Sequence, residues 1–450
     1  MVRVDSLARL LDALRHFPGG LHQEEKRPSV KTFARMAAIG LTASLALAAC
    51  SSAEPAQETG ELSGTVNMWA YPLTADKDEA FWAETAANFK KVHPDVDVKV
   101  TVQPWANRDQ LLTTAIAGGS APDAFYIIGG QVGTYQDLGA LAPLDDYVTA
   151  DELAEFNDSA VDAAQVDGST YMLPVLQGSM LVAYNKLAFE AAGIDEYPNT
   201  WEELEKAAPK LKAAGYYLME YQANVGTLNH NFLPFFWQAG GDLFSKDGSK
   251  VAFNSKAGKE TLLFIKELVD EDYIPQELLT ELRTNMAVPS AHTAAGDVAM
   301  QPLADNAAAT GIIEAWGEDN VEFGPPLTGP GAQTSYGLVA GYAMLESSKN
   351  KAATAEWLKF ITSEEVMPSI LELQNSLPAR KALTDLYPEG SPFHPFVKHL
   401  DLVRENDQNP KNRAVMTIFE PQVQAVLIGE KSIEQALADA EAEANRELGN

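Results

Sequence analysis

The apolar positions of this chain follow two periods that succeed one another along the sequence. Valine stands at every second position from 96 to 102 with polar residues between, which predicts a half-buried strand. Apolar residues recur at helical spacing over 81–89, after a short apolar run at 65–70. A helix predicted at 110–117 ends at two glycines and precedes another apolar strand at 124–128. Strands and helices in alternation predict an α/β fold with a parallel sheet covered by helices.

The same alternation continues toward the C-terminus. A mostly apolar stretch at 172–184 is interrupted by a polar run at 177–179, and a short buried strand is predicted at 298–300. Ser432 is the kind of residue that caps the start of a helix. Further helices are predicted at 201–212, 258–269, 347–361 and 433–444.

A short uncharged segment near the N-terminus ends at the single cysteine of the chain. Residues 36–49 carry no charge, Lys31 and Arg35 precede them, and Cys50 follows. A basic flank, an apolar core and small residues before a cleavage point predict a secretory signal rather than a buried helix. The segment is also shorter than the roughly 20 residues that a membrane-spanning helix needs. We therefore expect residues 1–49 to form a signal that is removed on export.

The residues around the cysteine indicate how the exported chain is held. Leu47-Ala48-Ala49-Cys50 resembles the lipobox of bacterial lipoproteins, which implies that Cys50 carries lipid. A redox or catalytic thiol is the alternative. Acyl chains contribute about 0.8 kcal/mol per buried CH₂, so more than one chain holds a protein firmly on a membrane. The polar residues that follow Cys50 predict a flexible tether over 50–64. Because residues 1–29 precede a complete signal, we predict that they are an over-called extension and that translation starts near Val30, not Met1.

Charge and composition exclude several classes of function. The chain has 450 residues, 63 of them acidic and 33 basic, with a net charge of −30. Nucleic acid and anionic lipid headgroups are poor partners for such a surface. One cysteine excludes intramolecular disulfides, cysteine-based zinc sites and iron–sulfur clusters. Because no phosphate loop, dinucleotide fingerprint, nucleophile elbow or metal-ligand histidine spacing appears, we expect no cofactor, no metal and no catalytic residues.

Several segments carry a family resemblance, in the order in which the family has them. Residues 115–123 look like the AxxxGxxPD signature of extracellular solute-binding proteins of ABC importers. The set resembles the sugar-binding group that includes maltose-binding protein. The other matching segments are 184–204, 237–241, 355–361, 378–381 and 429–437.

The resemblance implies a periplasmic-binding-protein-like fold and a function in uptake. Two α/β lobes would be joined by a hinge, with the ligand cleft between them. Lobe 1 is predicted to comprise 62–176 and 336–382, and lobe 2 to comprise 177–335 and 383–450. The resemblance further implies a non-enzymatic monomer that is lipid-anchored at the outer face of the cell membrane. It would capture a sugar and deliver it to a permease powered by a separate ATPase.

Candidate ligand contacts follow from this architecture, since ligands of open α/β sheets lie beyond the carboxyl ends of the strands. Aromatic faces pack on sugar C–H surfaces, polar side chains bond to hydroxyls, and glycines let a ligand approach the backbone. The alternatives are an ordinary turn for the glycines, a core position for the tryptophan and a helix start for the arginine. The candidates are Tyr71, Gly129, Gly130, Gln131, Gln177, Ser179, Trp237, Asp305, Asn306, Tyr336, Gly337 and Arg380.

Two departures from the family pattern argue against a maltodextrin as ligand. The maltose-binding relative has a charged pair where this chain has Gly130-Gln131, and a stacking aromatic residue where it has Asn306. Trp105 follows the valine strand and is placed to reach the rim of the cleft.

Other classes of function remain as alternatives. The same fold could bind a polyamine or another non-sugar solute, or serve as an adhesion or sensor module. The mostly neutral polar candidates favour sugar over polyamine. A secreted glycoside hydrolase would need two carboxylates about 5–9 Å apart across a cleft. No acidic residue here stands in such a motif.

Overall fold

The computed structural model describes residues 62–73, 77–105, 108–224, 226, 228–282, 288–374 and 376–449. The predicted signal at 1–49, Cys50 and most of the predicted tether lie outside the described residues. The folded body is the unit Ser63–Asn450.

Six strands form the larger of two main sheets, in the order β13-β6-β12-β3-β1-β2. β1 is parallel to both its neighbours, whereas β12 is antiparallel to β3 and to β6. The predicted valine strand is confirmed as β2, in which exposed and half-buried positions alternate after a buried first residue. The strands are β1 (Gly64–Ala70), β2 (Val96–Val102), β3 (Ala124–Ile128), β6 (Met172–Gln177), β12 (Val339–Met344) and β13 (Leu377–Pro378).

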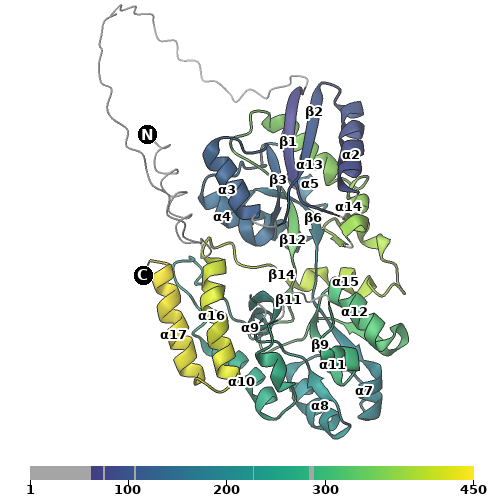
Figure 1. Ribbon diagram of the computed structural model, residues 1–450, viewed down its shortest axis with the longest axis vertical. Coiled ribbons are helices and arrows are strands. Elements are labelled where there is room, and N and C mark those ends of the chain that lie inside the picture. Colours follow the sequence, from purple (N-terminus) through teal and green to yellow (C-terminus); the bar gives the residue numbers. More distant parts are fainter. Residues whose placement is uncertain are drawn as a thin grey trace, which may run out of the picture. The chain divides into compact units, whose positions relative to one another are not determined.

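Helices cover this sheet and bury their apolar faces on it, and we call the resulting body lobe 1 (Figure 1). α2 has acidic residues in its first turn and lysines in its last, as the helix dipole favours. Its buried Phe89 packs edge-on against Trp357 of α13, with ring centroids 5.3 Å apart. The helices are α2 (Asp78–Val92), α3 (Arg108–Gly118), α4 (Val132–Asp137), α5 (Ala150–Leu153), α6 (Asp158–Ala164), α13 (Lys351–Ile361) and α14 (Met367–Gln374).

Four strands form the smaller sheet, in the order β10-β7-β9-β8, and the body around it is lobe 2. The predicted apolar stretch 172–184 is two strands, β6 and β7, and its polar run contributes the end of β6 and the link between them. The strands of lobe 2 are β7 (Leu181–Asn185), β8 (Tyr217–Met219), β9 (Val298–Ala304) and β10 (Val321–Gly324).

The helices of lobe 2 form its main core. α8 begins with a capping box in which Thr200 and Glu203 exchange hydrogen bonds, and Ser432 caps α17 as predicted. α10, α16 and α17 pack on one another (Figure 1). The ring of Phe253 stacks on that of Phe419, with centroids 4.0 Å apart. The helices are α7 (Lys186–Ala191), α8 (Trp201–Ala213), α9 (Phe232–Gln238), α10 (Lys256–Asp270), α11 (Ala291–Ala295), α12 (Asn306–Trp316), α16 (Asn412–Leu427) and α17 (Ile433–Glu447).

Three chain segments lie side by side where the chain passes between the two lobes. β11 (Ser335–Tyr336) pairs in parallel with β14 (Val403–Arg404), and Figure 1 shows both between the two sheets. The Gly178 N–H donates to the Leu338 carbonyl at 2.7 Å, and the Met180 N–H donates to the Tyr336 carbonyl at 3.0 Å. We call these three segments, 177–180, 335–339 and 403–406, the hinge.

The remaining elements are short, and most connect the larger ones. They are β4 (Gln165–Val166), β5 (Ser169–Thr170), α15 (His394–Lys398) and the 3₁₀ turns η2 (Gly129–Gln131), η3 (Leu228–His230), η4 (Gln276–Leu279), η5 (Glu318–Asn320), η6 (Lys381–Leu386) and η7 (Leu400–Leu402). Within the described ranges, no helix has the length and apolar character that crossing a membrane requires.

Candidate ligand-binding site

An aromatic cluster lies at the carboxyl ends of β1 and β2. Tyr71 directly follows β1, and its ring stacks on that of Trp105, with centroids 4.8 Å apart. Tyr71 is 4% exposed, whereas Trp105, which follows β2, is 44% exposed. The guanidinium carbon of Arg108 lies 5.3 Å from the centroid of the Trp105 ring. Lobe 1 therefore presents an indole ring that is backed by a buried tyrosine and flanked by a cation.

Polar side chains lie beside this cluster. Gln131 of η2 donates through Nε2 to Oδ1 of Asp109 at 3.0 Å. Burial raises the pKa of the Tyr71 hydroxyl and outweighs the nearby Arg108 guanidinium, so Tyr71 stays neutral and can donate or accept a hydrogen bond. One end of lobe 1 thus combines an aromatic surface with an amide, a carboxylate and a guanidinium.

The two glycines of η2 bring the hinge close to lobe 1. A Cβ placed on Gly129 would lie 3.2 Å from Cγ of Glu405, and one on Gly130 would lie 3.4 Å from Cβ of Asn406. The hinge segment 403–406 therefore packs next to Gly129 and Gly130.

Gln177 and Ser179 are both 1% exposed, and both are hydrogen-bonded within the protein. Nε2 of Gln177 donates to Oγ of Ser159 at 2.6 Å, and Oγ of Ser179 donates to the Phe396 carbonyl at 3.1 Å. Gly337 lies in the most crowded part of the hinge, since a Cβ there would lie 2.0 Å from Cγ1 of Val403. These bonds and this packing fix the place where the three segments meet.

A buried carboxyl group sits in the hinge, and the sequence predictions missed it. Glu405 accepts hydrogen bonds from the N–H groups of Val339, at 2.9 Å, and Asn406, at 2.8 Å. Burial raises the pKa of Glu405 to about 7 despite these bonds and a further one from the Tyr336 hydroxyl. The Tyr336 hydroxyl also bonds to Asn229 of lobe 2, and burial raises its pKa as well. Glu405 therefore contacts both the lobe 1 glycines and the tyrosine that faces lobe 2.

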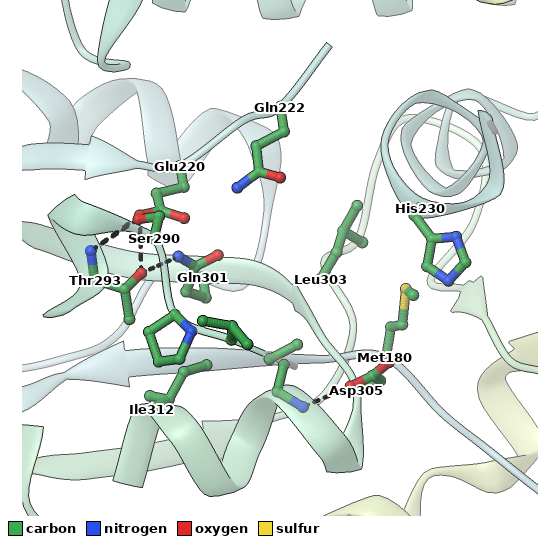
Figure 2. A pocket seen from close by; sticks show the side chains of 14 residues that line it. Met180, Glu220, Gln222, His230, Ser290, Thr293, Gln301, Leu303, Asp305 and Ile312 are labelled. Carbon is green, nitrogen blue, oxygen red and sulfur yellow. Dashed lines mark hydrogen bonds between the residues drawn. The ribbon is translucent and has the colours of Figure 1, made fainter. Parts of the chain in front are cut away.

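Lobe 2 contains a cavity of about 30 Å³ next to this tyrosine (Figure 2). Its walls come from the ends of β8 and β9, the start of α12 and residues 288–293. His230 lines the cavity, and its ring lies 5.3 Å from the Tyr336 ring. Asp305 also lines it, and its Oδ1 caps α12 by accepting the Ala308 N–H at 2.7 Å. Asn306, the first residue of α12, is half-buried but is not among the cavity residues.

One side of the cavity is a closed polar network. Oε1 of the buried Glu220 accepts hydrogen bonds from the Thr293 N–H at 3.0 Å and the Thr293 hydroxyl at 2.8 Å. Ser290 also donates to Glu220, and Gln301 donates to the Thr293 hydroxyl (Figure 2). Three hydrogen bonds therefore converge on Oε1 of this buried carboxyl group.

Two predicted contacts lie away from the cavity and from the aromatic cluster. Trp237 is 2% exposed in α9, and the Arg404 guanidinium carbon lies 4.8 Å from its ring centroid. Arg380 donates through Nε to the Thr362 carbonyl at 2.5 Å, pairs with Glu155 and lies 4.4 Å from the Phe156 ring centroid. The guanidinium of Arg380 is therefore held by other residues of lobe 1.

The predicted residues thus fall into three groups around the hinge. Tyr71 and Gln131 lie in lobe 1, Asp305 lines the cavity of lobe 2, and six positions form the hinge or touch it. Those six are Gly129, Gly130, Gln177, Ser179, Tyr336 and Gly337. In the part of the chain that the structure describes, no group of His, Cys, Asp or Glu has a metal-binding arrangement.

Comparison with known proteins gives consistent matches. The family described as bacterial extracellular solute-binding protein matches residues 71–368. The diacetylchitobiose binding protein DasA of Streptomyces coelicolor is 26% identical over 373 residues, which cover 77% of this chain and 82% of that protein. The GacH receptor of Streptomyces glaucescens, whose structure was determined unliganded and with acarbose, is 26% identical, with a TM-score of 0.65 over 86% of this chain and 99% of that one. The sugar-binding protein MalE of Xanthomonas citri has the same fold, with 20% identity and a TM-score of 0.74 over 86% of this chain and 98% of that one.

Proposed function

Because the chain belongs to the family of bacterial extracellular solute-binding proteins, we propose that it captures a sugar or short oligosaccharide between its two lobes for uptake through an ABC importer. The relatives named above support a sugar, since they bind diacetylchitobiose or were determined with acarbose. The captured sugar is then delivered to the permease in the membrane. The chain itself performs no catalysis in this scheme.

The stack of Tyr71 and Trp105 is the observation that carries this proposal. A sugar ring has apolar C–H faces and a rim of hydroxyls, so it needs an aromatic surface with hydrogen-bonding groups around it. Trp105 supplies the surface, and Arg108, Asp109 and Gln131 supply donors and acceptors at its edge. The cluster has one cation and one carboxylate, which suits a neutral polar solute better than a polyamine.

Capture works by closure of the two lobes. A ligand that contacts both lobes stabilises the closed form by the difference between its affinities for the closed and open forms. The hinge segments 177–180, 335–339 and 403–406 absorb the rotation, as short element-terminal segments do in hinged proteins. The predicted lobe boundaries, with lobe 1 from 62–176 and 336–382, are part of this proposal.

Anchoring keeps the captured solute near the permease. We propose that Cys50 carries the lipid and that the residues between Cys50 and the folded body act as the tether at the outer face of the membrane. The protein works there as a monomer.

A thermal-shift screen of the full chain tests the proposed function. Mono- and oligosaccharides are the test set, and polyamines and amino acids are the controls. A ligand that binds only the folded form stabilises it by RT ln(1 + [L]/Kd), about 2.7 kcal/mol at one hundred times Kd. We expect a raised melting temperature with at least one sugar and none with the controls. A shift with the controls alone would remove sugar as the substrate class, and an unchanged radius in solution scattering at saturating sugar would remove closure.

A further inference from the structure

The cavity of lobe 2 contains one polar group whose bonding is incomplete. Gln222, which follows β8, is 7% exposed, and its Oε1 has no hydrogen-bond partner among the described residues. Two positions earlier, Oε1 of Glu220 accepts hydrogen bonds from Ser290 and Thr293. Figure 2 shows the Gln222 side chain extending into the open space between Glu220 and His230. A buried acceptor that is left unpaired is costly, so this oxygen calls for a donor from a bound molecule.

The cavity is small and mostly apolar around this oxygen. Its volume of about 30 Å³ holds roughly two water molecules, so a whole pyranose ring cannot enter. Met180 and Leu303 form the wall between Gln222 and Asp305, with Ile312 further along (Figure 2), and Ala308 also lines the cavity. Such a space suits a small substituent of a sugar rather than its ring. A water molecule or a hydroxyl group would pair with Oε1 of Gln222, but the apolar side chains of the cavity would remain in contact with water.

His230 supplies the complementary hydrogen-bonding group. Burial lowers the pKa of His230, and this outweighs the nearby Asp305 carboxylate, so the imidazole is neutral at pH 7. A neutral imidazole has one N–H donor and one acceptor nitrogen. The cavity therefore offers an acceptor at Gln222, a donor at His230 and an apolar surface at Met180 and Leu303.

We propose that this cavity is a subsite for an acetamido group of the bound sugar. The amide N–H donates to Oε1 of Gln222, the amide carbonyl accepts from His230, and the methyl group packs on Met180 and Leu303. The ring that bears the group stays outside the cavity, beside Tyr336 of the hinge. This inference rests on the proposed function, because it names the class of sugar: one with an N-acetylated amino group.

Calorimetric titration of the full chain with matched sugar pairs tests this inference. The pairs are N,N′-diacetylchitobiose with cellobiose, N-acetylglucosamine with glucose, and N-acetylgalactosamine with galactose; maltotriose is included as a sugar without an acetamido group. One extra methylene-sized group in an apolar pocket changes selectivity about 10–200-fold. We therefore expect at least one N-acetylated sugar to bind ~10-fold or more tightly than its hydroxyl partner.

Two glutamine variants separate a local role from a structural one. Gln222→Leu removes the acceptor, and it should lower the affinity for the preferred N-acetylated sugar about 10-fold while its partner changes less than about 3-fold. Gln424→Leu is the matched control, since Gln424 is a half-buried glutamine of lobe 2 whose Nε2 bonds to the Leu279 carbonyl, away from the cavity. It should leave both affinities unchanged. The comparison of matched sugar pairs uses the unaltered protein, so it tests the inference even if a variant fails to fold.

The outcomes distinguish the two proposals. If hydroxyl sugars bind as tightly as their N-acetylated partners, or if maltotriose binds and no N-acetylated sugar does, the acetamido subsite is wrong and sugar capture stands. If no sugar binds to protein that melts cooperatively, the proposed function fails and the subsite fails with it. If Gln222→Leu and Gln424→Leu weaken binding equally, Gln222 does not contact the ligand and the assignment of the subsite is overturned.

Discussion

Substituting alanine for Gly337 should destabilise the protein at the centre of the hinge. A Cβ at this position would lie 2.0 Å from Cγ1 of Val403 and 2.3 Å from the carbonyl oxygen of Gly178. Both distances fall more than 1 Å short of ordinary van der Waals contact. Neither neighbour can yield easily, because the valine side chain is stiff at χ1 and the carbonyl belongs to an adjacent hinge segment. Relief therefore requires the hinge segments to separate.

The expected cost follows from the size of this overlap. Inserting a methyl group into a well-packed site costs typically about 1–3 kcal/mol. Unfolding entropy is about 2.1 cal/mol/K per residue, so in a folded unit of this size that cost lowers the melting temperature by about 1–4 °C. Urea denaturation followed by circular dichroism measures the free energy of unfolding directly.

Gly178 provides the matched control in the neighbouring hinge segment. A Cβ there would lie 3.8 Å from the nearest atoms, the backbone N and O of Leu338, which is ordinary contact. Gly178→Ala should therefore change the free energy of unfolding by less than about 0.5 kcal/mol. The reasoning is refuted if Gly337→Ala is as stable as the unaltered protein, or if the two variants are destabilised equally.

Three further predictions concern the hinge carboxyl, the aromatic surface and the anchor. Burial raises the pKa of Glu405 from 4.5 to about 7, so its contribution to stability is present below pH 4.5 and is lost as pH rises through 7. Glu405→Gln should therefore gain about 3 kcal/mol relative to the unaltered protein between pH 4.5 and 8 in urea titrations, and parallel pH profiles would contradict this. Trp105→Ala should weaken sugar binding about 10-fold or more by calorimetry, whereas Leu187→Ala, which removes a side chain of similar exposure on α7, should not; equal effects would exclude Trp105 as a contact. Cys50→Ala should move the protein from the membrane fraction to the soluble fraction and abolish its labelling by fatty acid, and unchanged fractionation would count against the lipid anchor.

The elements that the sequence predicted well are those with local signals. The alternating valines of β2 and the serine that caps α17 are contained within a few neighbouring residues, so their structure follows from the sequence nearby. The carboxyl ends of the strands also indicated Tyr71 and Asp305, because the edge of a sheet can be inferred once its strands are known.

The residues that sequence reasoning missed depend on partners far along the chain. Glu220 is bonded to Thr293, and Glu405 contacts Gly130, so no local pattern reveals either environment. Arg380 has a suitable side chain for ligand contact, yet its guanidinium pairs with Glu155, which is distant in the sequence. The short strand β8 was not predicted, and with it Gln222 was missed. A polar Glu-x-Gln pattern after a three-residue apolar strand was the available signal.

The position of β12 sets the order in which the two main sheets can form. β12, at Val339–Met344, lies between β3 and β6 in the larger sheet, so strands from the first 180 residues cannot complete that sheet by themselves. The smaller sheet, by contrast, has all four strands within residues 181–324. During synthesis from the N-terminus, the second lobe's sheet is available first, while β3 and β6 wait with unpaired edges for a strand made much later. Non-local pairing of this kind slows folding, so the nascent chain remains unfolded for longer, and a chain in that state can still be threaded across a membrane.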